Sequence, residues 1–431
     1  MLPSTPPRHI LILGYALFLL LVGAAVILFP LFWITLALSA TFLYVACLFM
    51  IHFIELKRET VPIITKWPSI SVVVPAYNRG EALEKCILHI KNMEYPGKKQ
   101  IIVVNDGSSD GTKELLAQTK GIVALNLGKN SGRKAFAVNA GIQKATGELI
   151  AVVDGDSYPN PDCLLRMVPH FFKDEKIGSV TSIVRVNNRT GILQKIQEIE
   201  YAIGFGLYNV VLSSFDSLFV TPGPLSIYRK EALAKAGGFD THVITEDMEI
   251  TFHLHQLGYS LALEQDAHVY SDVPETISAL FNQRMRWFRG GIETAYKYRA
   301  ELFSSQKIFF RFFFPMRLAL EFVTLVFFLL IVRMSYETLL TASTAFASLY
   351  TISFEVIPLP EWRFTATAFY YLLTTIVTLC IVIFGANTLQ KDKPSLSMPA
   401  LFLFLFVYGF FIAGIYVLSL TKLIIGVKNK W

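Results

Sequence analysis

Two long apolar blocks, one towards each end of the chain, constrain its fold more than any other feature. The first runs from Ile10 to Phe53 without a single Asp, Glu, Lys or Arg. A membrane-spanning helix needs about 20 apolar residues, so this block is long enough for two spans, divided near Pro30. The second block holds three candidate spans, at 312–333, 365–387 and 399–421. The pattern predicts a charged segment inserted between transmembrane helices.

Basic residues flank the first block: Arg8 lies before it, and Lys57 and Arg58 lie after it. Lys and Arg collect on the cytoplasmic side of membrane helices, so two spans with both flanks inside place the middle segment in the cytoplasm. A cleavable signal peptide is the alternative, but a second apolar run follows at once and argues against it. We therefore predict a multi-pass protein of the plasma membrane. Its expected parts are two spans in 1–65, a cytoplasmic domain in 66–272, amphipathic interface helices in 273–308, and about three spans in 309–431.

The charge and the cysteines exclude other classes of protein. Only 17% of the residues are charged, against about 25% in an ordinary soluble domain. Basic residues beside the apolar blocks explain much of the net charge of +6, so it does not indicate a nucleic-acid partner. The four cysteines are far apart and form no CxxC pair, which predicts reduced, structural residues rather than a zinc site. They are Cys47, Cys86, Cys163 and Cys380.

Strand-length and helix-length segments alternate at the start of the middle segment. Apolar runs predict strands at 69–77, 100–106, 121–128 and 147–157. Helical segments separate them, at 81–93, from Asp110 onwards, and at 133–145. This alternation predicts an α/β domain with a mostly parallel sheet and helices on both faces. Ligands of such sheets bind at the carboxyl ends of the strands.

Polar loops follow three of these strands. Their sequences are PAYN (75–78), NDGS (105–108) and DGD (154–156). Asp and Gly also favour turns, so each loop alone has a structural explanation. Three such loops at one edge of a sheet indicate a binding site. Asp154 and Asp156 are the strongest pair, because Mg²⁺ and Mn²⁺ bind carboxylate oxygens together with substrate phosphates.

The segment ITEDMEIT, residues 244–251, has two interpretations that stay open. Thr245 can cap a helix, with Glu246 and Asp247 near its positive N-terminus. Alternatively, Asp247 is a general base that removes a proton from a sugar hydroxyl. Downstream, His253 and His255 point to different faces of the expected helix, so we expect them to be structural.

The stretch NQRMRWFRGG, residues 282–291, predicts a basic helix shortly before the second apolar block. Gln283, Arg286 and Trp287 share a helix face, since they are spaced i, i+3 and i+4. The forked donors of Arg286 suit phosphate oxygens, and Trp287 can stack on a sugar ring. An amphipathic helix in the membrane interface is the alternative, and both interpretations hold together if the helix lies on the membrane and faces the site.

Charged residues also occur in or near a candidate span. Arg317 and Glu321 are spaced i, i+4 and either line a channel or form an ion pair at a helix end, and we favour the ion pair.

In this order and spacing, PAYN, NDGS, DGD, TED and QRMRW resemble the motifs of the membrane-embedded synthases of glycosyltransferase family 2, which make cellulose, chitin, hyaluronan and poly-N-acetylglucosamine. The resemblance covers about residues 69–300 and is strongest to the poly-N-acetylglucosamine branch, as in ILQKIQEIEYAIGF (192–205). It implies a GT-A fold and inverting, metal-dependent transfer from a UDP-sugar, here UDP-N-acetylglucosamine, to a growing β-linked polysaccharide. Processive synthesis with coupled translocation is also implied.

The resemblance further implies a role for each matching residue. Asp247 would be the catalytic base, and Asp154 and Asp156 would hold Mg²⁺ or Mn²⁺. The residues implied for UDP binding are Tyr77, Asp106, Lys134, Asp154 and Arg286, and those implied for the acceptor are Gln283, Trp287 and Glu246. The acceptor would be a polysaccharide or a lipid-linked glycan. Membrane lipids are further expected partners, and the resemblance leaves room for accessory subunits.

Two departures and two alternatives leave the function open. The loop VTPGPLSIYR (220–229) stands where the family has a Ser-Gly loop, and Arg79 follows PAYN where an acidic residue is usual. The sugar is therefore not fixed. A non-processive transferase acting on a lipid or short glycan is the first alternative. The second is a transporter or receptor whose cytoplasmic domain only binds a nucleotide, but such a protein has no need of Asp247.

Overall fold

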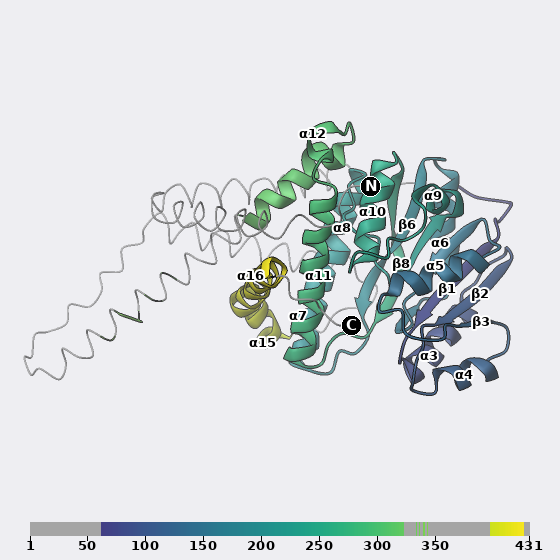
Figure 1. Cartoon of the computed structure of the whole chain (residues 1–431), viewed down its shortest axis with the longest axis horizontal. Coiled ribbons are helices and arrows are strands. Elements are labelled where there is room, and N and C mark those ends of the chain that lie inside the picture. The colour runs from purple at the N-terminus through teal and green to yellow at the C-terminus, as the bar shows by residue number, and fades with distance from the viewer. Residues whose placement is uncertain are drawn as a thin grey trace, which may run out of the picture.

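The computed structural model describes residues 62–322 and 397–425, with five isolated positions between these ranges. The predicted spans within 10–53 and 365–387, and residues 323–332 of the span predicted at 312–333, lie outside the described residues. Figure 1 shows a strand-rich body beside the long helix α11 (Ile277–Lys297). Two apolar helices, α15 (Met398–Leu403) and α16 (Gly409–Ile425), lie on the other side of α11.

A single eight-stranded sheet organises the body. Its strands are β1 (Ile70–Ala76), β2 (Lys99–Asn105), β3 (Val123–Asn126), β4 (Leu149–Val152), β5 (Ser157–Pro159), β6 (Ile177–Val186), β7 (Ser226–Arg229) and β8 (Ser260–Ser271). The spatial order is β3-β2-β1-β4-β7-β6-β8-β5. Strands β3, β2, β1 and β4 are all parallel, as the alternation of strands and helices predicts. The second half is mixed, because β7 runs antiparallel to β4 and β6, and β5 runs antiparallel to β8.

Helices connect the strands and cover both faces of the sheet. They are α3 (Gly80–Asn92), α4 (Thr112–Gln118), α5 (Lys134–Lys144), α6 (Cys163–Met167), α7 (Ile192–Tyr201), α8 (Asn209–Ser214), α9 (Lys230–Ala236), α10 (Glu246–Gln256) and α12 (Glu301–Ser304). Short helical turns of other types are η1 (Val168–Phe172), η2 (Ala202–Tyr208), η3 (Phe309–Phe313) and η4 (Phe404–Tyr408). The predicted fold class, a GT-A-like body of sheet and flanking helices, is confirmed.

The side chains of β1 show why the sheet is buried on both faces. Val73 packs in one apolar cluster with Ala135 of α5, whereas Val72 and Val74 pack in a second cluster with Leu83 of α3. Successive strand residues point to opposite faces, so a continuous apolar run is what a sheet covered on both sides requires. Cys86 and Cys163 are buried, free thiols in the second cluster.

An apolar helix packs against the body through α11. Residues Met398–Leu423 form the one helix in the described ranges that is long and apolar enough to cross a membrane, and they coincide with the predicted span at 399–421. The Ser419 hydroxyl donates a hydrogen bond to the Met285 carbonyl of α11 at 3.4 Å. Arg317 and Glu321 form the expected ion pair at 3.0 Å, and Tyr416 of α16 donates a hydrogen bond to Glu321 at 3.1 Å.

Candidate active site

The loops that follow β1 and β2 are joined at the carboxyl edge of the sheet. Asn78 accepts a hydrogen bond from the Ser109 backbone N–H at 2.8 Å, and its own N–H donates to the Ser108 hydroxyl at 3.0 Å. Tyr77 lies beside Asn78 with 42% of its surface exposed. Because β1, β2 and β4 are parallel neighbours, the three polar loops predicted to form a site meet at one edge.

Asp106 is buried and fixes the loop that leads into α5. Its two carboxylate oxygens accept hydrogen bonds from the Ser131 backbone N–H at 3.0 Å and the Ser131 hydroxyl at 2.7 Å. The next turn of this loop ends at Lys134, the first residue of α5. Asp106 therefore orders the segment that delivers Lys134.

Lys134 joins two acidic motifs that lie far apart in the sequence. Its ammonium nitrogen lies 2.5 Å from Asp154 Oδ1 and 2.8 Å from Glu246 Oε1. Asp154 follows β4, and Glu246 begins α10. A glycine closes this cluster, because a Cβ at position 223 would lie 2.5 Å from Lys134 Nζ and 2.7 Å from Asp154 Oδ2. A side chain at this position would therefore displace the charged ends of Lys134 and Asp154.

The charges of this cluster perturb one another. Burial lowers the pKa of Lys134, but the carboxylates of Asp154, Glu246 and Asp247 outweigh burial and hold this pKa well above its ordinary value. Burial raises the pKa of Asp247 to about 6, and Glu246 adds to this effect while Lys134 opposes it. A carboxyl group with a pKa near neutrality is a stronger base than an ordinary aspartate, as proton abstraction requires.

The start of α10 bears on the two interpretations of ITEDMEIT. Thr245 occupies the N-cap position, but its side chain makes no capping hydrogen bond, and its hydroxyl is buried without a partner. Asp247 Oδ1 instead accepts a hydrogen bond from the Met248 backbone N–H at 2.8 Å. Asp247 therefore lies at the positive helix terminus and beside the Lys134 cluster at once.

Asp154 and Asp156 supply two carboxylates from one loop. Lys134 is paired with Asp154, and Arg79 lies 3.1 Å from Asp156. Within the described ranges, no group of three or more His, Cys, Asp or Glu side chains is arranged to hold a metal ion alone. Two carboxylates do fit Mg²⁺ or Mn²⁺ when substrate phosphates and water complete the oxygen ligands. The donor set therefore suits a divalent ion that is shared with a phosphorylated substrate.

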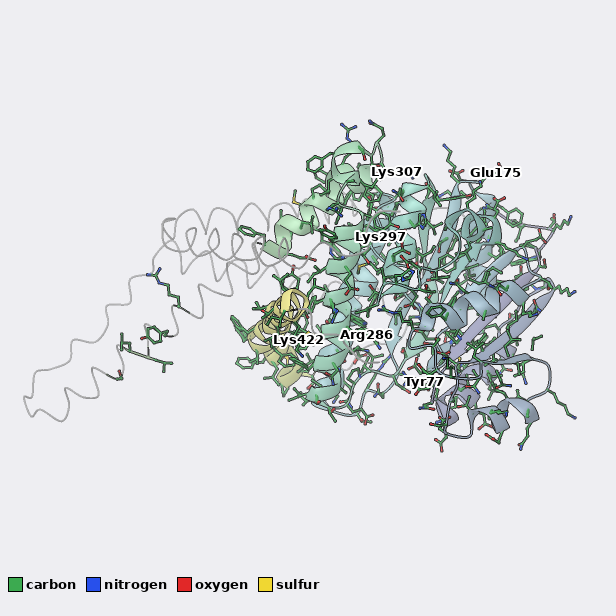
Figure 2. All side chains as sticks on the ribbon, in the orientation of Figure 1. Tyr77, Glu175, Arg286, Lys297, Lys307 and Lys422 are labelled. Carbon is green, nitrogen blue, oxygen red and sulfur yellow. The ribbon has the colours of Figure 1, made fainter. Side chains whose placement is uncertain are left out.

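A cleft of about 1760 Å³ extends from these loops along α11. Of the predicted site residues, Asp156, Gln283 and Arg286 line it. Figure 2 shows Arg286 near the middle of α11, with Lys297 further along the same helix. The cleft also contains basic residues that the sequence interpretation missed as site residues, among them Arg79, Arg133 and Arg289. Arg289 follows Arg286 by three residues, so extending the helical periodicity would have found it.

Trp287 is not among the residues that line this cleft. Its ring packs against Tyr201 and Phe205, with centroid distances of 6.4 and 6.1 Å. The guanidinium of Arg284 lies 4.1 Å from the centroid of the same ring. Arg284 is also a residue that the sequence interpretation missed, and it pairs with Glu200 of α7 across 84 positions.

Close helix packing sets the distance between the two halves of the site. A Cβ at Gly290 of α11 would overlap the side chain of Thr245, at the start of α10. The glycine therefore lets α11 approach the turn that carries Asp247. The packing of α10 on α11, of which this contact is a part, therefore fixes the turn with the predicted base relative to the helix with Arg286.

Comparisons with known proteins find related glycosyltransferases. Residues 71–237 match the family model described as Glycosyl transferase family 2. A poly-β-1,6-N-acetyl-D-glucosamine synthase from Staphylococcus epidermidis is 37% identical over 227 residues, which cover 52% of this chain and 55% of that relative. The synthase of the same name from Staphylococcus aureus (strain COL) is 34% identical over 241 residues, which cover 55% of this chain and 57% of the relative. The chain thus spans little more than half the length of these relatives.

A solved structure supports the fold. The mannosyltransferase PcManGT from Pyrobaculum calidifontis, in complex with GDP-Man and Mn²⁺, superposes with a TM-score of 0.58 at 21% sequence identity. The match covers 84% of this chain and 99% of that chain. At this identity the likeness concerns the fold alone.

Proposed function

We propose that this chain, whose residues 71–237 match the model of glycosyl transferase family 2, transfers N-acetylglucosamine from UDP-N-acetylglucosamine to a growing β-linked polysaccharide at the membrane. The observation that carries the proposal is the cluster of Lys134, Asp154 and Glu246, with Asp247 as the adjacent base. The choice of sugar is supported by the 37% identity to a poly-β-1,6-N-acetyl-D-glucosamine synthase.

The nucleotide would bind over the loops at the carboxyl edge of the sheet. Tyr77 offers an exposed ring for the base, and Asp106 has lone pairs beyond those that Ser131 occupies. Arg286, on the cleft wall, would donate forked hydrogen bonds to the diphosphate. Lys134 would hold the Asp154 side chain in place beside the phosphates.

Asp154 and Asp156 would hold Mg²⁺ or Mn²⁺ together with the diphosphate. When bound, the ion supplies positive charge that stabilises the leaving UDP. The Mn²⁺ in the mannosyltransferase complex is consistent with such use in this fold. Arg79 would exchange its present contact with Asp156 for one with the incoming phosphates.

Transfer would be a single displacement at the anomeric carbon. The acceptor hydroxyl oxygen forms a bond to C1 as the bond from C1 to the diphosphate oxygen breaks, and Asp247 takes the hydroxyl proton. Attack opposite the leaving group inverts the centre, so an α-linked donor gives a β-linked product. Gln283, Trp287 and Glu246 would orient the acceptor, which raises the rate by fixing the reacting atoms in position.

The contact between α11 and α16 supports growth of the product at a membrane. The helix with the acceptor residues packs directly on the apolar helix that ends at Leu423. A chain extended at α11 would emerge beside the membrane, which suits processive synthesis with coupled translocation.

The decisive experiment uses the purified chain in lipid with Mg²⁺ or Mn²⁺. UDP-N-acetylglucosamine, UDP-glucose and UDP-glucuronate are offered in turn, and the labelled product is sized. A long polymer from UDP-N-acetylglucosamine alone supports the proposal, and a polymer from another donor corrects the sugar. A single added sugar, or product only with a lipid acceptor, would replace it with a non-processive transferase.

A further inference from the structure

Three helices meet around one buried arginine. Arg284 is 1% exposed and lies on α11, one residue after Gln283. Helix α7 and the apolar helix formed by α15, η4 and α16 pack around it through a shared apolar cluster, composed of Ile196, Ile199, Leu280, Ala400, Leu401 and Tyr408. A guanidinium in such surroundings is costly unless its donors are satisfied, so the contacts of Arg284 are informative.

The Arg284 guanidinium donates hydrogen bonds through Nε and both terminal nitrogens. The Nε and one terminal nitrogen bind the carboxylate of Glu200, with Nε 3.2 Å from Oε1. The Tyr408 hydroxyl, from η4 of the apolar helix, donates to the same carboxylate at 2.8 Å. Glu200 of α7 is therefore held from two sides, by α11 and by the apolar helix.

The other terminal nitrogen of Arg284 donates to the side-chain oxygen of Gln283. A guanidinium can only donate, so it fixes the Gln283 amide with its oxygen inward. The NH₂ group of Gln283, which lines the cleft, is then left to donate to an oxygen of a ligand.

The same guanidinium lies 4.1 Å from the centroid of the Trp287 ring. The Trp287 ring also contacts Tyr201 and Phe205, which pack edge to face with each other at 4.9 Å. The Arg284 cation thus packs on one face of the indole, and two aromatic rings contact the indole as well. Arg284 touches two of the three predicted acceptor residues, Gln283 and Trp287, yet it does not line the cleft itself.

We propose that Arg284, Glu200 and Tyr408 form a positioning unit that holds Gln283 and Trp287 in the geometry needed to bind the sugar acceptor. The inference rests on the proposed glycosyl transfer and assigns a role to residues for which the resemblance implies none. The Gln283 donors would select an acceptor oxygen, either a sugar hydroxyl or an amide carbonyl. Because Tyr408 belongs to the apolar helix, acceptor binding depends on the docking of this helix.

If these residues position the acceptor, their loss should affect two reactions of the enzyme differently. Transfer needs the acceptor residues, whereas slow hydrolysis of the UDP-sugar by water needs only the donor side of the site. Tyr408→Phe keeps the ring and removes the hydrogen bond to Glu200, and Arg284→Lys keeps the charge but loses the fork. Both variants should raise the KM for an added β-linked N-acetylglucosamine oligomer roughly tenfold, with UDP-sugar hydrolysis within about twofold of wild type.

Two matched controls lie on the same helices. Glu198 of α7 pairs with Arg189 rather than with α11, and Tyr416 of α16 bonds to Glu321. Glu198→Gln and Tyr416→Phe should leave the oligomer KM unchanged. Thermal unfolding of all four variants identifies any that fail to fold, and Tyr408→Phe remains informative where Arg284→Lys is unstable.

The outcomes are distinguishable. If folded Tyr408→Phe and Arg284→Lys keep the wild-type oligomer KM, or lose hydrolysis and transfer equally, the positioning role is wrong and the unit is only structural. If the wild-type chain neither transfers a sugar nor hydrolyses any UDP-sugar, the proposed function fails instead.

Discussion

Lys134 is one cation shared by acidic residues of different loops. It contacts Asp154 and Glu246 directly and lowers the pKa of Asp247. This buried cation offsets the repulsion between carboxylates that lie so close together. Lys134 thus links the loop that is expected to hold the metal to the helix that carries the base. The sequence interpretation assigned it to the nucleotide alone.

Replacement of Asp247 by Asn tests its role as the base. The amide cannot accept the acceptor proton, so we expect transfer to fall by roughly 10²- to 10⁴-fold. UDP binding should stay nearly intact, because Asp247 is expected to face the acceptor rather than the nucleotide. Radiolabelled transfer and calorimetric titration with UDP measure the two effects. Lost UDP binding with a lowered melting temperature would identify Asp247 as a helix-terminus residue instead.

The pH dependence of transfer should report the same carboxyl group. Burial and Glu246 raise the pKa of Asp247 to about 6, with Asp154 adding to the effect and Lys134 opposing it. The deprotonated form accepts the proton, so activity is present above pH 6 and is lost as the pH falls through this value. We expect about a tenfold loss per pH unit well below the pKa. A profile of kcat that stays flat down to pH 5 would contradict this assignment.

At the scale of elements, the contact between α10 and α11 aligns the base with the phosphate donor. Gly290 of α11 faces Thr245. A side chain at position 290 would collide with the short, β-branched Thr245 side chain, not with the end of a long, flexible one. The neighbouring Gly291 has Met248 Sδ as its nearest atom, at the ordinary contact distance of 3.7 Å. Two adjacent helix glycines thus differ in one respect, their distance from α10.

Gly290→Ala and Gly291→Ala form a matched pair. Alanine in place of glycine stabilises a helix by up to about 1 kcal/mol, which is what we expect of Gly291→Ala. At Gly290 the added methyl group must push the two helices apart, and we expect a loss of about 1–3 kcal/mol. Transfer should fall only in Gly290→Ala, since the shift separates Asp247 from Arg286. Melting temperature and transfer rate are compared in detergent, and equal behaviour of the two variants would exclude a tight contact.

At the scale of the whole molecule, local patterns predicted the parallel strands but not the contacts that join distant segments. Apolar runs of strand length identified β1 to β4, because buried parallel strands need apolar side chains on both faces. The antiparallel strand β7 was not predicted, because a run of four residues does not indicate whether a strand is parallel or antiparallel to its neighbours. Arg284 was missed as well, because its partner Glu200 is 84 positions away and only packing of α7 on α11 unites them. The assignments of all the predicted site residues to ligands or to catalysis, from Tyr77 to Trp287, remain predictions.

The side of the membrane on which the catalytic domain lies follows from charge. Arg8, Lys57 and Arg58 flank the first apolar block, so we expect residues 66–308 to face the cytoplasm. Glu175 is an exposed residue of the strand-rich body, far from α11 in Figure 2. Cys86 and Cys163 are buried, and burial raises the pKa of both thiols, so they should react poorly with maleimides. Cys47 and Cys380 are predicted to lie in apolar spans.

Glu175→Cys therefore gives a single reactive thiol that reports the orientation. A membrane-impermeant maleimide should label this variant only after the cells are permeabilised, because a cytoplasmic thiol is inaccessible from outside. The unmodified chain serves as the control and should stay unlabelled in both conditions. Equal labelling of intact and permeabilised cells would place the domain outside, and the charge argument would fail. A cytoplasmic result would put the base, the arginine-lined cleft and the donor on the same side of the membrane, with the apolar helix on α11 as the route for the product.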